Sequence, residues 1–137
     1  RYLTDNNRGQ LSALIITGAW IEAQYLATQV IKQYPDDLLR DRIGEQKQFL
    51  NDLIRMMEPY CNLDRQYAGL CSKLKEISDK YDDVEISFTE GEPVSMEQDG
   101  GLVITQTETS EVEMTDKQLE DIIKITEKIR NALIVNK

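Results

Sequence analysis

One stretch of the chain constrains the fold more than any other: residues 11–34, LSALIITGAWIEAQYLATQVIKQY, have the composition of a helix that is apolar almost all the way round. A surface helix usually has one apolar stripe, whereas this segment has apolar residues on opposite sides and a single carboxylate, Glu22. We therefore predict a central helix that needs cover on both sides. One side carries Ile16, Trp20, Ala23, Ala27, Ile31 and Tyr34, and the other carries Leu14, Ile21 and Tyr25.

Two segments after Pro35 repeat apolar residues in alternating steps of four and three, the spacing of helices that pack along a seam. We predict one helix from Asp36 to about Glu58 and another that starts at a cap on Asn62. Because a short turn joins them, we expect an antiparallel helical hairpin. The first seam is Leu39, Ile43, Gln46, Leu50, Leu53, Met57 and Tyr60, and the second is Leu63, Tyr67, Leu70, Leu74, Ile77, Tyr81 and Val84.

A last helix is predicted after a capping box formed by Thr115 and Gln118. The first helix is expected to start near Asn6 or Asn7 and to end before Pro35. The predicted fold class is therefore all-α: a four-helix antiparallel bundle in which residues 1–137 form a single helical domain. The apolar stripe of the last helix is Leu119, Ile122, Thr126, Ile129 and Leu133.

Residues 82–114 form an acidic insertion between the third and fourth helices. From Tyr81 to Asp116 the chain contains eleven Asp or Glu residues and no Lys or Arg. Residues 84–88 alternate in the manner of a strand, and residues 101–105 are candidates to pair with them as a short β-hairpin. An irregular, disordered connector is the competing interpretation, and the sequence does not choose between the two.

The composition excludes several classes of function. A net charge of −9 makes nucleic acid a poor partner, because such binding depends on Lys and Arg neutralising phosphates. The chain has no histidine and no CxxC pair, which argues against zinc and against His-based nucleophile arrangements. We therefore predict no catalytic, cofactor-binding or metal-ligating residue. The uncharged run from Gly9 to Ile21 is too short for a transmembrane segment.

Cys61 and Cys71 lie ten residues apart. If both are on one helix, their Cα atoms are separated by about 15 Å, which is too far for a disulfide. We expect two small, partly buried residues, and the redox compartment stays open.

The candidate interaction or ligand-cleft residues lie together on the first helix: Trp20, Ile21, Glu22 and Tyr25. Aromatic residues at helical spacing more often belong to a core than to a ligand site. A carboxylate on an apolar helix needs a partner or a raised pKa, and the expected partners of Glu22 are Arg42, Lys47 or Arg65. Gln46, inside an apolar seam, is expected to set helix register.

Two motifs, residues 18–22 (GAWIE) and 42–47 (RIGEQK), belong to a region that resembles a group of uncharacterised helical lipoproteins of the Bacteroidetes. The resemblance covers roughly residues 2 to 80, and Ala19 departs from the Gly-Gly-Trp-Ile-Glu form expected in that group. It implies a longer protein, with a signal peptide, a lipidated cysteine and a helical portion upstream of Arg1. The location would be the periplasm, at a membrane face.

From these features we expect a non-enzymatic structural or interaction domain of a cell-envelope lipoprotein. Its expected partner is the missing N-terminal portion of the same protein or a second copy bound through the first helix. The alternative is a small-molecule binding or sensor domain with a cleft near Trp20 and Glu22. A deep pocket beside Trp20 that contains Glu22 would favour binding, whereas a solid core would favour a structural role.

Overall fold

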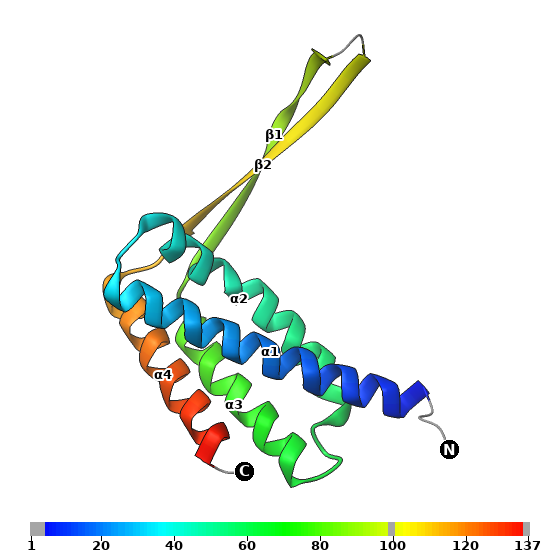
Figure 1. Cartoon of the computed structure of the whole chain (residues 1–137), viewed down its shortest axis with the longest axis vertical. Coiled ribbons are helices and arrows are strands. Elements are labelled where there is room, and N and C mark those ends of the chain that lie inside the picture. Colours follow the sequence, from blue (N-terminus) through cyan, green and yellow to red (C-terminus); the bar gives the residue numbers. More distant parts are fainter. Residues whose placement is uncertain (1–4, 99–100, 136–137) are drawn as a thin grey trace.

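The computed structural model describes the backbone of residues 5–98 and 101–135 and the side chains of residues 8–87 and 111–133. Within these ranges the chain forms four α-helices: α1 (Asp5–Gln33), α2 (Asp37–Met57), α3 (Arg65–Tyr81) and α4 (Asp116–Val135). A short 3-10 helix, η1 (Glu58–Tyr60), follows α2, and two strands, β1 (Glu85–Gln98) and β2 (Gly101–Glu113), lie between α3 and α4. The predicted all-α bundle with a hairpin insertion is confirmed (Figure 1).

Each helix packs against two others, in the cyclic order α1, α2, α3, α4, and consecutive helices run antiparallel. In Figure 1, α1 lies across the front of the other helices, and the β-hairpin projects from the end where α1 turns into α2. α1 ends at Gln33, before Pro35, as predicted. It begins at Asp5, within two residues of the start predicted at Asn6 or Asn7.

Side-chain caps define the starts of two helices. The capping box before α4 is confirmed: the Gln118 backbone N–H donates to Thr115 Oγ1 at 3.1 Å, and the Thr115 N–H donates to Gln118 Oε1 at 2.7 Å. The predicted cap of the third helix at Asn62 is wrong. Asp64 takes that position, since its carboxylate accepts a hydrogen bond from the Tyr67 N–H at 3.0 Å.

The core follows the predicted seams of α2 and α3, with one exception. Leu63 is 52% exposed, because it lies in the turn before α3 and not on the helix. Burying a leucine, isoleucine or methionine side chain stabilises a fold by about 1.5–3 kcal/mol. The buried residues of the two seams therefore hold the helical hairpin together. The fully buried apolar residues include Ile43, Leu50, Met57, Leu74, Ile77, Tyr81, Val84, Ile122 and Ile129.

The β-hairpin differs from the predicted pairing of residues 84–88 with residues 101–105. Residues 85–88 pair instead with 110–113, and residues 101–105 pair with 94–98. Gln98 is opposite Gly101, and the pairing continues from there toward the bundle with one irregularity between Glu90 and Pro93. The strands are also longer than the apolar runs that signalled them.

Two cations on α2 bind the base of the hairpin. The Lys47 ammonium donates to the carbonyl oxygens of Asp82 and Val84, at 3.1 and 2.7 Å, where the chain enters β1. The Arg40 guanidinium donates to the carbonyl oxygen of Met114, where the chain leaves β2. Both ends of the insertion are therefore fixed to the same helix.

Between these two cations, Gly44 allows α2 and β2 to approach closely. A Cβ atom at this position would collide with Cγ1 of Val112. Gly44 is buried and lies in a helix, where glycine costs about 1 kcal/mol relative to alanine. The close contact with Val112 accounts for glycine at this position.

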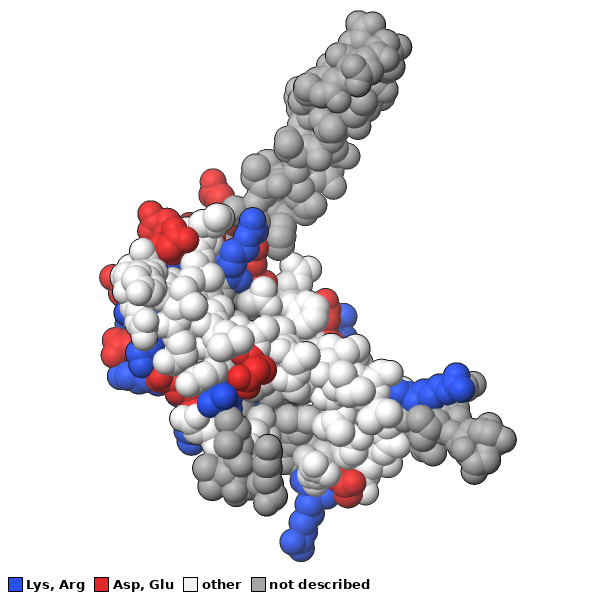
Figure 2. All heavy atoms as spheres, in the orientation of Figure 1, with Lys and Arg blue, Asp and Glu red and all other residues white. Residues whose placement is uncertain are grey.

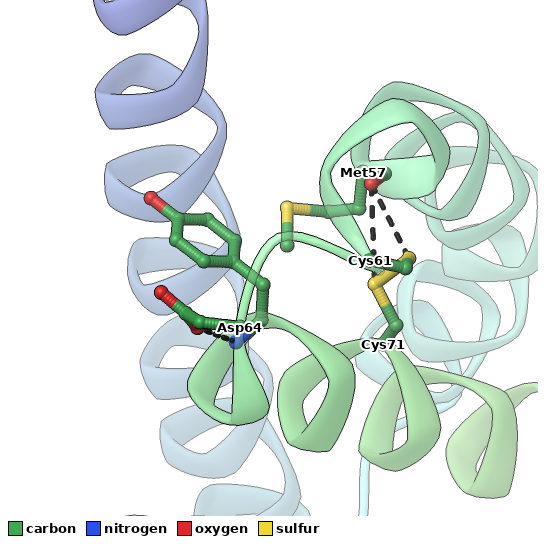
Figure 3. Close-up of a disulfide and its surroundings, with 5 residues drawn as sticks. Met57, Cys61, Asp64 and Cys71 are labelled. Atoms are coloured by element: carbon green, nitrogen blue, oxygen red, sulfur yellow. Dashed lines mark hydrogen bonds between the residues drawn. A yellow bond between two sulfur atoms is a disulfide. The ribbon is translucent and has the colours of Figure 1, made fainter.

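Cys61 and Cys71 form a disulfide, with their Cα atoms 5.9 Å apart (Figure 3). The expectation that they are too far apart is wrong, because Cys61 lies in the turn after η1 while only Cys71 is on α3. The carbonyl oxygen of Met57 lies 3.3 Å from Cys61 Sγ, a contact without a hydrogen bond because oxidised sulfur carries no proton. The disulfide ties the turn to the second turn of α3 and so fixes the α2–α3 connection.

Candidate functional site

Helix α1 is buried along one face only. Apart from the adjacent Trp20 and Ile21, the buried residues are spaced by three or four positions, which places them on one side of the helix. Of the two sides predicted to need cover, the one with Leu14, Ile21 and Tyr25 is covered within the chain, whereas Ile16 and Tyr34 on the other side stay exposed. The buried residues are Ala13, Thr17, Trp20, Ile21, Gln24, Thr28 and Ile31.

Trp20 lies against α2. Its indole Nε1–H donates to Gln46 Oε1 at 2.8 Å, and the side chain is 7% exposed. A groove of about 230 Å³ runs beside it, between α1 and α2, and is lined by Ala23, Gln24 and Leu39 among others. Glu22 does not line this groove. Gln46 thus accepts a hydrogen bond from the buried indole N–H of Trp20. This bond explains a polar residue in the apolar seam better than a role in setting helix register alone.

A buried polar network crosses the core behind this groove. Gln24 Nε2 donates to the Tyr81 hydroxyl, and that hydroxyl donates to the carbonyl oxygen of Ile43, both at 2.7 Å. Burial raises the pKa of the Tyr81 phenol well above its usual value, although the hydrogen bond from Gln24 acts in the opposite direction. The network joins α1, α2 and α3 through one side chain.

Glu22 and Tyr25 lie on the other side of α1 and meet Arg130 of α4. Nε and Nη2 of Arg130 each lie 3.2 Å from a carboxylate oxygen of Glu22, a bidentate ion pair. The same guanidinium lies over the Tyr25 ring, 4.2 Å from its centroid. The predicted partners of Glu22 are therefore wrong, since none of Arg42, Lys47 or Arg65 lies on the helix that faces it.

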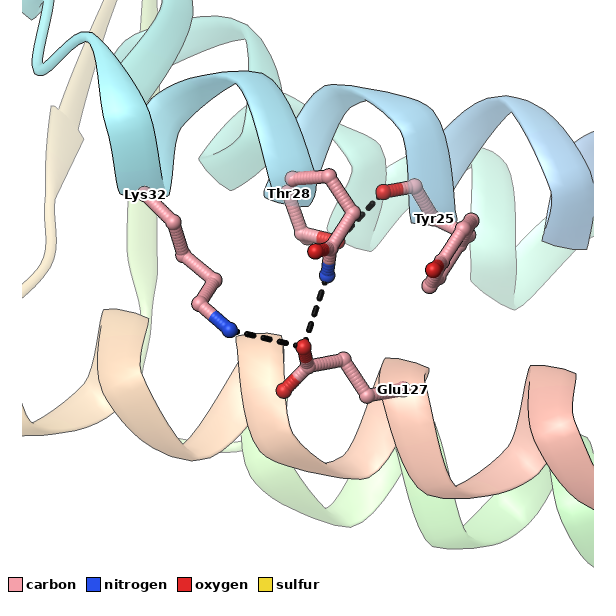
Figure 4. Close-up of polar contacts among 5 residues, drawn as sticks. Tyr25, Thr28, Lys32 and Glu127 are labelled. Atoms are coloured by element: carbon pink, nitrogen blue, oxygen red, sulfur yellow. Dashed lines mark hydrogen bonds and ion pairs between the residues drawn. The ribbon is translucent and has the colours of Figure 1, made fainter.

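A second ion pair continues this α1–α4 border (Figure 4). The Glu127 carboxylate accepts hydrogen bonds from Lys32 at 2.8 Å and from Gln29 at 2.7 Å. These bonds, the one from Lys32 first, hold the pKa of Glu127 below its usual range. The Thr28 hydroxyl donates to the Tyr25 carbonyl oxygen at 2.7 Å. Two ion pairs, Glu22–Arg130 and Lys32–Glu127, therefore join α1 to α4 along this border.

The four residues proposed as one site do not share one surface. Trp20 faces α2, Ile21 is 2% exposed in the core, and Glu22 and Tyr25 border α4. The pocket that would favour ligand binding, beside Trp20 and containing Glu22, is therefore not formed. Sequence reasoning missed the surface that the helix does present, because an all-round apolar helix does not indicate which of its sides is covered.

That surface is the outer face of α1. Its residues follow spacings of 4, 4, 3, 4 and 4, so they form a nearly straight row along the side away from the buried stripe. The row contains Leu11, Ile15, Ala19, Glu22, Leu26 and Val30. Figure 2 shows the surface over α1 as a broad area with few charged residues. Leu11, Ile15, Leu26 and Val30 are 45%, 60%, 55% and 50% exposed.

Two further open hollows have volumes of about 500 Å³ or more. One, of about 770 Å³, lies between α2 and the base of the hairpin, beside Lys47 and Glu113. The other, of about 500 Å³, lies beside the disulfide. Among the described residues, no cluster of acidic residues or cysteines is arranged to hold a metal ion. None of the helices there is both long enough and apolar enough to cross a membrane.

No protein-family model, no curated protein and no solved structure matches this chain. The resemblance to the Bacteroidetes lipoproteins therefore stays a prediction, and the function is argued from the surface itself.

Proposed function

We propose that this protein is a non-enzymatic structural or interaction domain that binds another polypeptide through the outer face of α1. One observation carries the proposal: four large aliphatic side chains lie in a row on that face, each about half exposed. They leave on the order of 400 Å² of apolar surface in water, which is typical of the largest patch on a monomer and often marks a binding site.

The surroundings of this row also favour a protein partner. The α4 side is bordered by the ion pairs Glu22–Arg130 and Lys32–Glu127, which are already satisfied within the chain. Aliphatic side chains beside polar groups that are already paired are compatible with a protein interface, which combines apolar and polar contacts. A long, straight helix face also matches the shape of another helix better than that of a small molecule.

We place this domain, as part of the same proposal, in a lipoprotein of the bacterial cell envelope, facing the periplasm. The support is the motif resemblance given above, and the Cys61–Cys71 disulfide is compatible with it, because disulfides persist in oxidising compartments. The partner is then the upstream portion of the same protein or a second copy of the chain.

Site-specific photo-cross-linking tests the proposal in the cells that naturally make the protein. A photoreactive amino acid replaces Leu26 in one variant and Leu63, of nearly equal exposure, in a control variant. We expect position 26 to give a defined polypeptide product that position 63 does not give, and mass spectrometry identifies it. Equal labelling from both positions, or none from position 26, would contradict the proposal.

The groove beside Trp20 is the one observation that favours the alternative, a small-molecule binding or sensor domain. It contains the amide groups of Gln24 and Gln46, of which Gln24 Nε2 donates to the Tyr81 hydroxyl and Gln46 Oε1 accepts from Trp20. Its volume of about 230 Å³ is also below the range of about 300–1,000 Å³ that is usual for ligand pockets. The interaction function is therefore the better supported of the two.

A further inference from the structure

We infer that the partner on the outer face of α1 is a second copy of this chain, with the two α1 helices packed antiparallel about a twofold axis. This inference rests on the proposed function, since it names the partner of the same surface. It is carried by three observations: the order of side chains along the row, the unpaired charges at its two ends and the area available.

The row is nearly palindromic. At each end of the row, the two outermost positions hold branched aliphatic residues. These are Leu11 and Ile15 at the N-terminal end, and Val30 and Leu26 at the C-terminal end. The spacing of 4, 4, 3, 4 and 4 is the same in both directions. In an antiparallel pair, Leu11 therefore meets Val30 of the other copy, and Ile15 meets Leu26. A twofold interface requires this self-complementarity, because one patch must fit itself.

The middle of the row allows the two helices to approach. Ala19 is small, and in the antiparallel register it lies opposite Glu22 of the other copy. The Glu22 carboxylate is turned toward Arg130 on its own chain and neutralised by it, so the crossing point is not left with an unpaired charge. A short side chain at a helix crossing permits a small distance between axes.

The ends of the row carry opposite charges. Arg8 continues the row by one turn at the N-terminal end, and Asp36 and Asp37 follow α1 at its C-terminal end. Within the part of the chain that is described, none of these three side chains makes an ion pair. In the antiparallel arrangement each Arg8 lies near the two aspartates of the other copy, whereas a parallel arrangement places like charges together.

The area is sufficient for association. With the flanking Ile16 and Tyr34, which are 41% and 70% exposed, two copies would bury on the order of 1,200 Å² in total. That value is near the lower limit of a specific interface, so the dimer should form reversibly.

Disulfide cross-linking of the full chain tests the arrangement. Ile15→Cys and Leu26→Cys variants are prepared separately, with different tags, and the native cysteines do not compete because they are joined to each other. Mixed variants should cross-link efficiently. Each variant alone should not, because residue 15 lies about 11 residues, or roughly 16 Å, along the axis from its own copy.

Charge reversal gives an independent readout in the same mixtures. Arg8→Glu should lower the yield of mixed cross-links several-fold, and so should Asp36→Lys combined with Asp37→Lys. A chain that carries Arg8→Glu, Asp36→Lys and Asp37→Lys together should regain the yield. Opposite charges then still face each other across the interface, with their signs exchanged. Lack of restoration would overturn the assignment of these charges to the interface.

The remaining outcomes separate this inference from the proposed function. Cross-linking of Ile15→Cys with itself would indicate parallel helices and overturn the antiparallel arrangement, while the face would still bind a polypeptide. Absence of every disulfide product, together with photo-cross-linking from position 26 to a different protein, would overturn the second copy alone. Absence of both kinds of product would overturn the inference and the proposed function together.

Discussion

At the scale of single residues, polar side chains decide how α1 sits in the bundle. Trp20 is anchored by Gln46, and Gln24 by the hydroxyl of Tyr81, so the helix is fixed in rotation by two hydrogen bonds. The sequence identified Gln46 as a polar member of an apolar seam but gave no partner. The partner is Trp20, which lies 26 residues away on α1. The periodic pattern of one helix contains no information on which residue of another helix it will contact.

We predict that Gln46→Leu lowers the free energy of unfolding by about 1–3 kcal/mol, because it leaves a buried indole N–H without an acceptor. Urea denaturation measures this. Gln46→Glu, which keeps the acceptor oxygen, is the control and should lose less. In the Trp20→Phe background the cost of Gln46→Leu should largely disappear, and an unchanged cost there would show that the hydrogen bond is not its origin.

Tyr81 should make the fold sensitive to alkaline pH. Because burial raises the pKa of its phenol in the folded state, the unfolded chain releases this proton first as the pH rises. Stability is therefore fully retained below about pH 10, the usual tyrosine pKa, and decreases above it. Denaturation at several pH values from 8 to 11 should give a smaller decrease for Tyr81→Phe than for wild type. Equal slopes would contradict a buried neutral phenol.

At the scale of elements, the hairpin is fixed to α2 by contacts that no local pattern announces. Arg40, Gly44 and Lys47 are spaced by four and three, so they face one side of the helix, and the base of the hairpin lies there. The glycine of the motif at residues 42–47 has a physical reason, because a Cβ atom at Gly44 would collide with Val112. The predicted hairpin was one of two open alternatives, since acidic strands with few apolar residues resemble a disordered connector.

Gly44→Ala should destabilise the protein by about 1–3 kcal/mol through collision of the new methyl group with Val112, despite the better helix propensity of alanine. Combining it with Val112→Ala should recover most of the loss. Gly18→Ala is the matched control, because no atom lies within 4 Å of a Cβ placed there. It should be neutral or stabilising by up to about 1 kcal/mol, and thermal unfolding compares the variants. A Gly44→Ala protein as stable as Gly18→Ala would contradict the close packing of α2 on β2.

The distal part of the hairpin should contribute little to the stability of the bundle. Its main contact with the helices is between α2 and β2, and the strands otherwise pair with each other. Replacing residues 90–108 with an Asn-Gly turn keeps the base of the hairpin and should change the melting temperature by less than about 4 °C. Lys47→Met, which releases the base itself, should lower it more. The reverse order would mean that the distal hairpin belongs to the cooperative core.

At the scale of the whole molecule, the number, order and antiparallel packing of the helices were predictable, because two consecutive 4-3 seams admit few other arrangements. The disulfide was not, since it depends on the path of a turn that places Cys61 off the helix. The orientation of α1 was not predictable either. Apolar residues surround this helix, and its three buried polar residues, Thr17, Gln24 and Thr28, gave no sign in the sequence of a core position.

Because α1 is oriented in this way, its outer face is exposed. Sedimentation equilibrium tests directly whether this face holds two copies of the chain together. Wild type should pass reversibly from the monomer to twice its mass as the concentration approaches about 1 mM. Leu26→Lys should stay monomeric and folded, while Leu63→Lys, which charges a leucine of nearly equal exposure off this face, should dimerise like wild type. A wild type that stays monomeric throughout, or a Leu26→Lys variant that associates equally well, would contradict the account.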